Sequence, residues 1–416
     1  MDIFNIMKNQ PIINIGCLGS VSDGKSTLVE KLTGIKTQKH SNEKDRNITI
    51  KQGYGNMKIW YNNINNQYYS TDSTQTNLTI DNNSMDLVNN ISFVDCPGHQ
   101  DLIKTLLSAI SLMDGVIIVI AVNQSIDKKR QLIEQLKAIK LCNFNKIIIC
   151  LNKIDLINKN TLLIRKKELD DLLLKFDIKP FIIIPTCFNQ KIGLDNILIS
   201  IMNLFNPNNY KNKINDMPLF RITRSFDINK PGIDWCDVKG GVIGGALISG
   251  SLKVGDIIEI KPGYISYDKE NNKTINTILK TKILSLKTEN NNIDSIIPGG
   301  LIGIGTDIDP FYCKNDILIG NICCIEDTIN NIYNEINIKI NNNIFNNDWK
   351  PFINENIILQ IHNKSFESQI ININNDLLKC KLNDPCCIYE NMNDNIIICK
   401  YNLGVLDIIT NGSIIK

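Results

Sequence analysis

Long apolar runs are missing from this 416-residue chain: none approaches the about 18 residues that span a membrane. Its first residues, Met1-Asp-Ile-Phe-Asn, lack the charged and apolar regions of a signal peptide. Charge of one sign is not in excess either, because 45 basic residues against 43 acidic ones leave a net charge of +2. Arginine is rare, and none follows Arg224. We therefore expect a cytoplasmic protein without a membrane partner, whose nucleic-acid contacts come from local patches.

The thirteen cysteines include no C-x-x-C pair, the spacing typical of thiolate metal sites. Cys323-Cys324 and Cys386-Cys387 are adjacent pairs inside apolar runs. This pattern favours reduced, buried thiols over disulfides or a metal centre. With 43% hydrophobic and 21% charged residues, the composition is that of a globular protein of about two to four domains.

The stretch Gly19-Ser-Val-Ser-Asp-Gly-Lys-Ser-Thr27 matches the phosphate-loop pattern G-x-x-x-x-G-K-S. The apolar segment Ile12–Leu18 precedes it, and apolar residues recur at helical spacing after it. A strand, this loop and a helix are the context that phosphate binding requires, because backbone N–H groups and the helix N-terminus both attract an anion. Lys25 would reach the β- and γ-phosphates, and the Ser26 hydroxyl would bind Mg²⁺.

Two later segments fit the same site. The polar stretch 37–52 contains Thr49, whose hydroxyl could bind Mg²⁺ while the backbone contacts a γ-phosphate. The apolar run that starts at Ile91 ends in Asp95-Cys-Pro-Gly-His99. This arrangement presents a second carboxylate linked to Mg²⁺, and it lets the Gly98 amide sense the γ-phosphate. Taken alone, either segment is equally explained as an ordinary strand and turn.

Asn152-Lys153-Ile154-Asp155 follows the buried strand predicted at 146–151. The Asp155 carboxylate can accept two N–H groups of guanine, whereas adenine would leave it unsatisfied. The loop Thr186-Cys187-Phe188 follows the next predicted strand, where it could touch the base. Three such elements in this order predict a GTP-binding domain with a doubly wound, mostly parallel α/β sheet.

The rest of the chain predicts two all-β domains. In the first part, helices are expected at 102–113, 128–141 and 161–176, strands at 54–61, 115–121 and 180–185, and a loop or hairpin in the Asn-rich insert 62–90. From about residue 217 helical periodicity vanishes, and strands are expected at 219–226, 241–248, 256–261 and 281–286 and around 303–305 and 318–322. We predict a GTP-binding domain at 1–209 and β-barrels at 217–327 and 330–416.

Several segments together resemble the gamma subunit of eukaryotic and archaeal translation initiation factor 2, clearly from Ile12 to Cys323 and faintly beyond. They are Asn47–Tyr54, Asp95–His99, Asn152–Asp155, Arg224-Ser-Phe-Asp-Ile-Asn-Lys-Pro-Gly232, Lys239–Gly245, Lys253–Asp256, Pro298–Gly305 and Asp307–Pro310.

This resemblance implies a GTPase that carries initiator methionyl-tRNA to the small ribosomal subunit, as the core of a heterotrimer with alpha and beta subunits. GTPase-activating and nucleotide-exchange factors would act on it. His99 would lie beside the attacking water, and Ser26, Thr49 and, through water, Asp95 would serve Mg²⁺. The nucleotide would be bound by Gly19, Ser22, Asp23, Gly24, Lys25, Ser26, Thr27, Thr49, Asp95, Gly98, Asn152, Lys153, Asp155, Thr186, Cys187 and Phe188.

The chain departs from the family pattern in its phosphate loop, which in relatives usually reads Gly-His-Val-Asp/Ala-His-Gly-Lys. Both histidines are absent here, and an Asp stands in the phosphate environment. We expect the Asp23 side chain to point outward; weakened nucleotide affinity is the alternative. No cysteine lies between Cys17 and Cys96, so the zinc knuckle of many relatives is not expected. The third domain also lacks the arginine-rich stretch of relatives near Ile397–Tyr401.

Two other functions are compatible with these residues. An elongation-type aminoacyl-tRNA carrier, such as the selenocysteine-specific factor, shares the domain layout, although Arg224–Gly232 and Lys239–Gly245 argue against it. A nucleotide-binding scaffold with little hydrolysis is suggested by Ser22-Asp23. Slow hydrolysis alone would not favour the scaffold, because this family depends on an activating protein.

Overall fold

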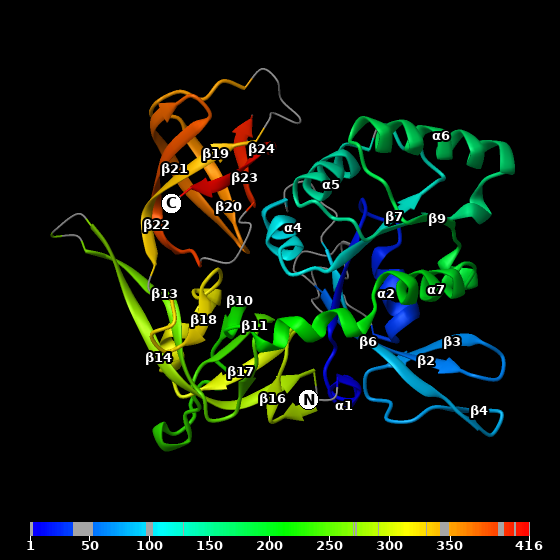
Figure 1. Cartoon of the computed structure of the whole chain (residues 1–416), viewed down its shortest axis with the longest axis horizontal. Coiled ribbons are helices and arrows are strands. Elements are labelled where there is room, and N and C mark those ends of the chain that lie inside the picture. The colour runs from blue at the N-terminus through cyan, green and yellow to red at the C-terminus, as the bar shows by residue number, and fades with distance from the viewer. Residues whose placement is uncertain are drawn as a thin grey trace. The chain divides into compact units, whose positions relative to one another are not determined.

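A computed structural model describes residues 3–35, 53–96, 103–127, 129–268, 270, 273–289, 291–329, 331–341, 349–389, 395–402 and 405–415. The chain separates into two compact units, Met1–Asn209 and Tyr210–Lys416 (Figure 1). No helix in these ranges is both long and apolar enough to cross a membrane.

The first unit is built on a seven-stranded mixed sheet in the order β3-β2-β6-β1-β7-β8-β9. Its parallel part comprises β6 (Asp86–Asp95), β1 (Ile13–Leu18), β7 (Gly115–Ala121), β8 (Ile147–Asn152) and β9 (Ile182–Pro185). Every residue of β1, β7 and β8 is buried, which explains why these strands are continuous apolar runs. The predicted doubly wound, mostly parallel sheet is confirmed.

The helices of this unit differ from the predicted ones mainly at their ends. They are α1 (Ile3–Met7), α2 (Lys25–Thr33), α4 (Ile103–Ile110), α5 (Arg130–Leu141), α6 (Lys159–Lys175) and α7 (Leu194–Leu204), with 3-10 turns η2 (Ile154–Leu156), η3 (Phe188–Gln190) and η4 (Pro207–Asn215). The sequence analysis missed α1 and α7. The amphipathic pattern was present in α7, where Ile197, Leu198 and Ile201 are buried at helical spacing.

The Asn-rich insert forms a hairpin at the sheet edge rather than a loop. In it β2 (Gly53–Asn62) pairs antiparallel with β3 (Gln67–Asp72), followed by the short pair β4 (Thr79–Ile80) and β5 (Asn83–Ser84). The indole of Trp60 donates to the Thr71 hydroxyl at 2.8 Å across the hairpin. Cross-strand aromatic and polar pairs of this kind stabilise a ribbon that the Asn content alone would not.

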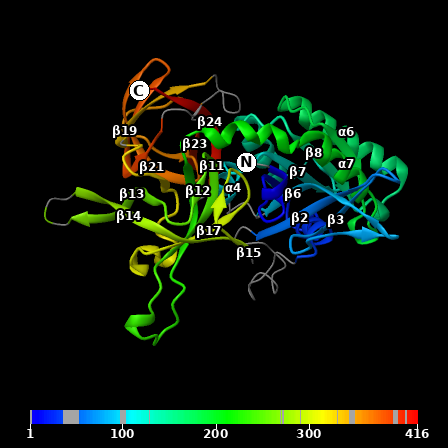
Figure 2. The ribbon, with the colours of Figure 1, turned by 60° about the horizontal axis from the view of Figure 1, so that its bottom comes forward.

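The second unit begins with a closed six-stranded barrel in the order β13-β18-β10-β11-β17-β14, closed by the β13–β14 pairing. Its strands are β10 (Leu219–Phe226), β11 (Val242–Ser249), β13 (Ile257–Asp268), β14 (Lys273–Thr288), β17 (Ile302–Thr306) and β18 (Ile322–Ile325). The far ends of β13 and β14 continue past the barrel as a two-stranded ribbon (Figures 1 and 2). Smaller elements are η5 (Trp235–Asp237), β12 (Leu252–Lys253), β15 (Asn291–Ile293), β16 (Ser295–Ile296) and η6 (Pro310–Asp316).

One strand prediction in this barrel was wrong in position. The segment around 318–322 is mostly a turn, and β18 starts only at Ile322. Gly320 has φ +85°, a left-handed conformation that ends any strand through it.

A second closed barrel follows in the order β19-β22-β21-β20-β23-β24. Its strands are β19 (Ile332–Ile340), β20 (Asn356–Ile361), β21 (Lys364–Asn374), β22 (Leu377–Cys387), β23 (Asn395–Asn402) and β24 (Val405–Ile415). All thirteen cysteines of the chain are free thiols, and only Cys142 and Cys236 are not buried. Burial raises the pKa of Cys380 in this barrel to about 12, so the thiol packs as a small apolar group.

A polar cluster joins the two barrels of the second unit. Arg221 on β10 places Nη2 3.1 Å from Nδ1 of His362 and donates to the Tyr389 hydroxyl at 2.9 Å. The His362 ring stacks on Tyr389 with centroids 5.4 Å apart. Burial, reinforced by the Arg221 charge, holds the pKa of His362 well below its usual value.

Candidate functional site

The carboxyl ends of the parallel strands bring the predicted site residues to one edge of the first unit's sheet. Gly19 follows β1, Asp95 ends β6, Asn152 ends β8 and Thr186 follows β9. Ligands of open α/β sheets bind at this edge, because the loops there converge and helix N-termini point at them.

The phosphate loop needs glycine at two positions. Gly19 has φ +139° and Gly24 has φ +109°, conformations that residues with a side chain rarely adopt. A Cβ on Gly19 would lie 2.2 Å from the carbonyl oxygen of Val119, and one on Gly24 would lie 2.4 Å from Nδ2 of Asn152. The loop is therefore a tight cradle, and exposed Ser22 forms its tip with φ +64°.

Lys25 begins α2 and is buried inside the loop, where its ammonium donates to the Ser20 carbonyl at 2.8 Å. Burial lowers the pKa of Lys25, while the nearby Asp95 and Asp23 carboxylates oppose that shift. The first turn of α2 contains Lys25, Ser26 and Thr27, whose backbone N–H groups precede the hydrogen bond from the Leu28 amide to the Gly24 carbonyl. A cation and these N–H groups converge in one place, which is the chemistry that binds phosphate.

Ser26 and Asp95 lie side by side, as a shared magnesium site requires. The Ser26 hydroxyl donates to Oδ2 of Asp95 at 2.8 Å, and Asp95 is fully buried. Hydroxyl and carboxylate oxygens suit Mg²⁺, which takes one or two protein ligands and completes its shell with phosphate and water. The donor set therefore fits Mg²⁺, although within the described ranges no cluster of three His, Cys, Asp or Glu side chains could hold a metal alone.

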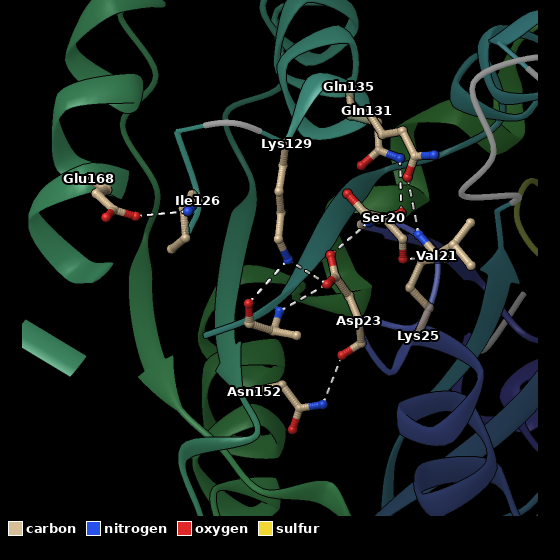
Figure 3. A network of polar contacts seen from close by, with 12 residues as sticks. Ser20, Val21, Asp23, Lys25, Ile126, Lys129, Gln131, Gln135, Asn152 and Glu168 are labelled. Atoms are coloured by element: carbon tan, nitrogen blue, oxygen red, sulfur yellow. Dashed lines mark hydrogen bonds and ion pairs between the residues drawn. The ribbon is translucent and has the colours of Figure 1, made fainter. Parts of the chain in front are cut away.

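The prediction that Asp23 points outward was wrong. The residue is buried, and its carboxylate accepts hydrogen bonds from the Ser20 amide at 2.8 Å and the Ala121 amide at 3.2 Å. Its Oδ1 also forms an ion pair with Nζ of Lys129 at 2.6 Å (Figure 3). A buried carboxylate is stable only with such partners, and the ion pair with Lys129 and the two amide bonds supply them.

On the base side, Asn152 joins the phosphate loop to the loop after β9. Its Nδ2 donates to the Asp23 carbonyl at 2.9 Å, and its Oδ1 accepts from the Phe188 amide at 3.3 Å and the Thr186 hydroxyl at 3.5 Å. Lys153, with φ +65°, then turns the chain into η2. The Asn152 side chain thus links the phosphate loop to the loop after β9.

Asp155 is exposed in η2, so its carboxylate is available to a ligand. Cys187 lies against it: burial and a side-chain hydrogen bond with Asp155 both raise the pKa of the Cys187 thiol. Phe188 is buried in η3, and its amide donates to Oδ1 of Asn152. Of the residues predicted to contact the base, Cys187 therefore lies beside Asp155, and Thr186 and Phe188 contact Asn152.

Three predicted residues, Thr49, Gly98 and His99, lie outside the described residues. Three others were missed: Lys129, Gln131 and Gln135 of the α5 segment, which bind the phosphate loop. The order of strands and helices places the start of α5 at the same sheet edge, but only the structure shows which side chains reach the loop.

Comparisons with known proteins show which family the chain belongs to. Residues 10–214 match the family model of the elongation factor Tu GTP binding domain. The chain is 33% identical over 396 residues to the eukaryotic translation initiation factor 2 subunit gamma of Encephalitozoon cuniculi, covering 93% of this chain and 89% of that one. It is 39% identical over 315 residues to the translation initiation factor 2 subunit gamma of Thermoplasma volcanium, covering 75% and 74%. The chain belongs to the gamma-subunit family of translation initiation factor 2.

Membership in this family confirms the predicted resemblance and makes the chain a GTPase of translation initiation. Among solved structures, the bacterial selenocysteine-specific elongation factor EF-Sec matches with a TM-score of 0.72 and 20% identity, over 97% of this chain and 58% of that one. Elongation factor SelB of Methanococcus maripaludis with a GTP analogue matches with a TM-score of 0.70 and 18% identity, over 98% and 80%. At this identity the likeness establishes the fold of a GTPase domain followed by two barrels.

Proposed function

We propose that this chain carries initiator methionyl-tRNA in its GTP-bound state to the small ribosomal subunit, in the cytoplasm and as the core of a heterotrimer with alpha and beta subunits. The main support for this proposal is the match to a gamma subunit over 93% of this chain and 89% of the relative. A match of this length includes both barrels as well as the GTPase domain. The working parts would be the GTP-binding domain at 1–209 and the barrels at 217–327 and 330–416. Activating and exchange factors would drive its cycle.

In this proposal Lys25 and the first turn of α2 hold the phosphates, and Ser26 with Asp95 holds Mg²⁺. When bound, Mg²⁺ neutralises charge on the β- and γ-phosphates. Asp155 accepts the guanine N–H groups, and Asn152 keeps the base loop against the phosphate loop. Thr49, Gly98 and His99 would add the contacts to Mg²⁺, γ-phosphate and water that the family resemblance implies.

The elongation-type carrier is the second candidate, since the fold matches EF-Sec over 97% of this chain. Sequence identity favours initiation, at 33% with a gamma subunit against 20% with EF-Sec. The scaffold function was suggested by the acidic residue in the phosphate loop. This argument is weakened, because Asp23 is buried and paired with Lys129 and does not face the phosphates as an unpaired charge.

The first experiment titrates fluorescent GTP, GDP and ATP analogues into the purified chain. We expect tight binding of both guanine nucleotides and weak binding of ATP. Failure to bind guanine nucleotide would refute both carrier functions.

The second experiment measures filter retention of initiator and elongator methionyl-tRNA with GTP and with GDP, on the chain alone and with its alpha and beta subunits. We expect GTP-dependent retention of the initiator tRNA in preference to the elongator. Equal retention of the two tRNAs would count against the initiation carrier, and preference for the elongator tRNA would favour the elongation-type carrier.

A further inference from the structure

An ion pair lies buried inside the phosphate loop. The Asp23 and Lys129 side chains are 3% and 9% exposed, and Oδ1 and Nζ are 2.6 Å apart. Figure 3 shows Lys129 reaching from the start of α5 to the carboxylate, which lies between the loop and the end of β7. The ammonium also donates to the Ala121 carbonyl at 3.1 Å. Lys129 is therefore fixed at both the loop and the sheet.

The same side of the loop is bound at two further points of α5. The Val21 amide donates to Oε1 of Gln131 at 3.2 Å, and Nε2 of Gln135 donates to the Gly19 carbonyl at 3.0 Å. From the opposite side Asn152 donates to the Asp23 carbonyl (Figure 3). The loop backbone is thus held by side chains of α5 and β8, with Asp23 at the centre.

An acidic residue in this place is costly for a loop that binds a polyanion. Two negative charges repel strongly where little water separates them, and a buried carboxylate without a partner is destabilised as well. Lys129 offsets both effects, because it cancels the charge of Asp23 and keeps the carboxylate turned toward β7. With Asp23 neutralised by Lys129, the ammonium of Lys25 in the same loop can interact with the phosphates without being drawn to an unpaired carboxylate.

We propose that Lys129 is a positioning residue for nucleotide binding, which neutralises and orients Asp23 so that the phosphate loop accepts the charged phosphates of GTP. This inference rests on the proposed placement of the nucleotide at this loop, but not on the proposed tRNA role. Lys129 acts through Asp23 and needs no contact with the nucleotide.

The test compares the wild-type chain with Lys129→Met, Asp23→Asn and the double variant, using fluorescent GDP and a non-hydrolysable GTP analogue. We expect Lys129→Met to bind GDP on the order of tenfold more weakly, because an uncompensated carboxylate then faces the phosphates. The loss should be larger for the GTP analogue, which carries more negative charge. Adding Asp23→Asn to Lys129→Met should recover most of the lost affinity, and the Asp23→Asn variant completes the double-mutant cycle.

Lys137→Met is the matched control, since Lys137 lies on the same helix and pairs with Glu134 at 2.7 Å away from the loop. It should leave both affinities unchanged.

Lys129→Arg keeps the charge and should retain binding, which covers the case that Lys129→Met does not fold. The inference is overturned if Lys129→Met binds GDP and the GTP analogue as tightly as the wild type does. Where Lys129→Met is unfolded, the inference is overturned if the folded Lys129→Arg variant or the folded double variant fails to retain binding. Equal losses for GDP and the GTP analogue would likewise assign the pair a merely structural role. Failure of the wild-type chain to bind guanine nucleotide would instead refute the proposed site itself.

Discussion

The hydroxyl of Ser26 donates a 2.8 Å hydrogen bond to Oδ2 of Asp95, which joins the first turn of α2 to the end of β6. The two oxygens come from segments 69 residues apart, and only the parallel pairing of β1 with β6 brings them together. This relationship gives Mg²⁺ a defined place beside the phosphate loop.

Replacing Ser26 with Ala should therefore remove the Mg²⁺ dependence of nucleotide binding. The loss of one oxygen ligand and of the bond to Asp95 should cost about 1.5 to 3 kcal/mol of affinity with Mg²⁺ present and little in EDTA. Titration of fluorescent GDP in both buffers measures this difference. Ser108→Ala is the control, because its hydroxyl only binds the Lys104 carbonyl within α4. If Ser26→Ala retains the full stimulation by Mg²⁺, the magnesium site is misplaced.

Alanine substitutions of Gly24 and Gly34, at the two ends of α2, distinguish the effect of backbone strain from that of a steric collision. Both have a left-handed backbone, with φ +109° and +72°. At Gly24 a Cβ would lie 2.4 Å from Nδ2 of Asn152, whereas at Gly34 it would meet nothing within 4 Å among the residues that the structure describes. Gly34→Ala should lower stability by about 1–2 kcal/mol and leave GDP affinity unchanged. Gly24→Ala should also displace the Asn152 amide and abolish measurable binding. Thermal unfolding with GDP titration tests this, and similar GDP affinity in the two variants would contradict it.

Asp155 should determine which base is bound. In Asp155→Asn the acceptor of two guanine N–H groups becomes half donor, which suits the extra carbonyl of xanthine. We expect affinity for GDP to fall at least about 100-fold and affinity for xanthosine diphosphate to rise. Competition titrations against a fluorescent nucleotide measure both, with Asp170→Asn as the control, since that residue only pairs with Lys166 on the surface of α6. Unchanged preference for guanine would place the base pocket elsewhere.

The motifs predicted the strand ends and the joint location of the site because their chemistry needs fixed local geometry. Gly19, Gly24 and Lys25 can serve a phosphate only between a strand and a helix, so their spacing implied the local fold. The same holds for Asn152 and Asp155 at the end of β8. Local rules of this kind transfer directly from sequence to structure.

Side-chain direction could not be predicted in the same way. Asp23 was expected to point outward, whereas the partner that holds it inward, Lys129, lies 106 residues further along the chain. The prediction for Asn152 left out its contacts within the protein for the same reason. Its side chain contacts the phosphate loop and the loop after β9, which are distant from it in sequence. Such pairings depend on tertiary proximity, which one sequence does not state.

The barrels offer a prediction about pH. His362 is half-buried and contacts both Arg221 and Tyr389, and its pKa lies well below the value of about 6.5 that an unfolded chain has. Below that pH the unfolded chain takes up a proton that the native state excludes. Stability should therefore be unaffected by His362 at high pH and should decrease as pH falls below about 6.5, with a slope of up to about 1.4 kcal/mol per pH unit.

The His362→Asn variant removes this titration while tolerating the φ of +51° at that position. Urea unfolding of the full chain between about pH 5 and pH 7.5 should show a shallower pH slope for the variant than for the wild type. Trp349, which packs against the core of the second barrel, can report that transition by fluorescence. Carboxylates with a lowered pKa, such as Glu259 beside Lys261, lose their contribution only near and below about pH 4.5, outside this window. Identical slopes in the two proteins would mean that His362 accepts its proton in the folded barrel despite the adjacent Arg221.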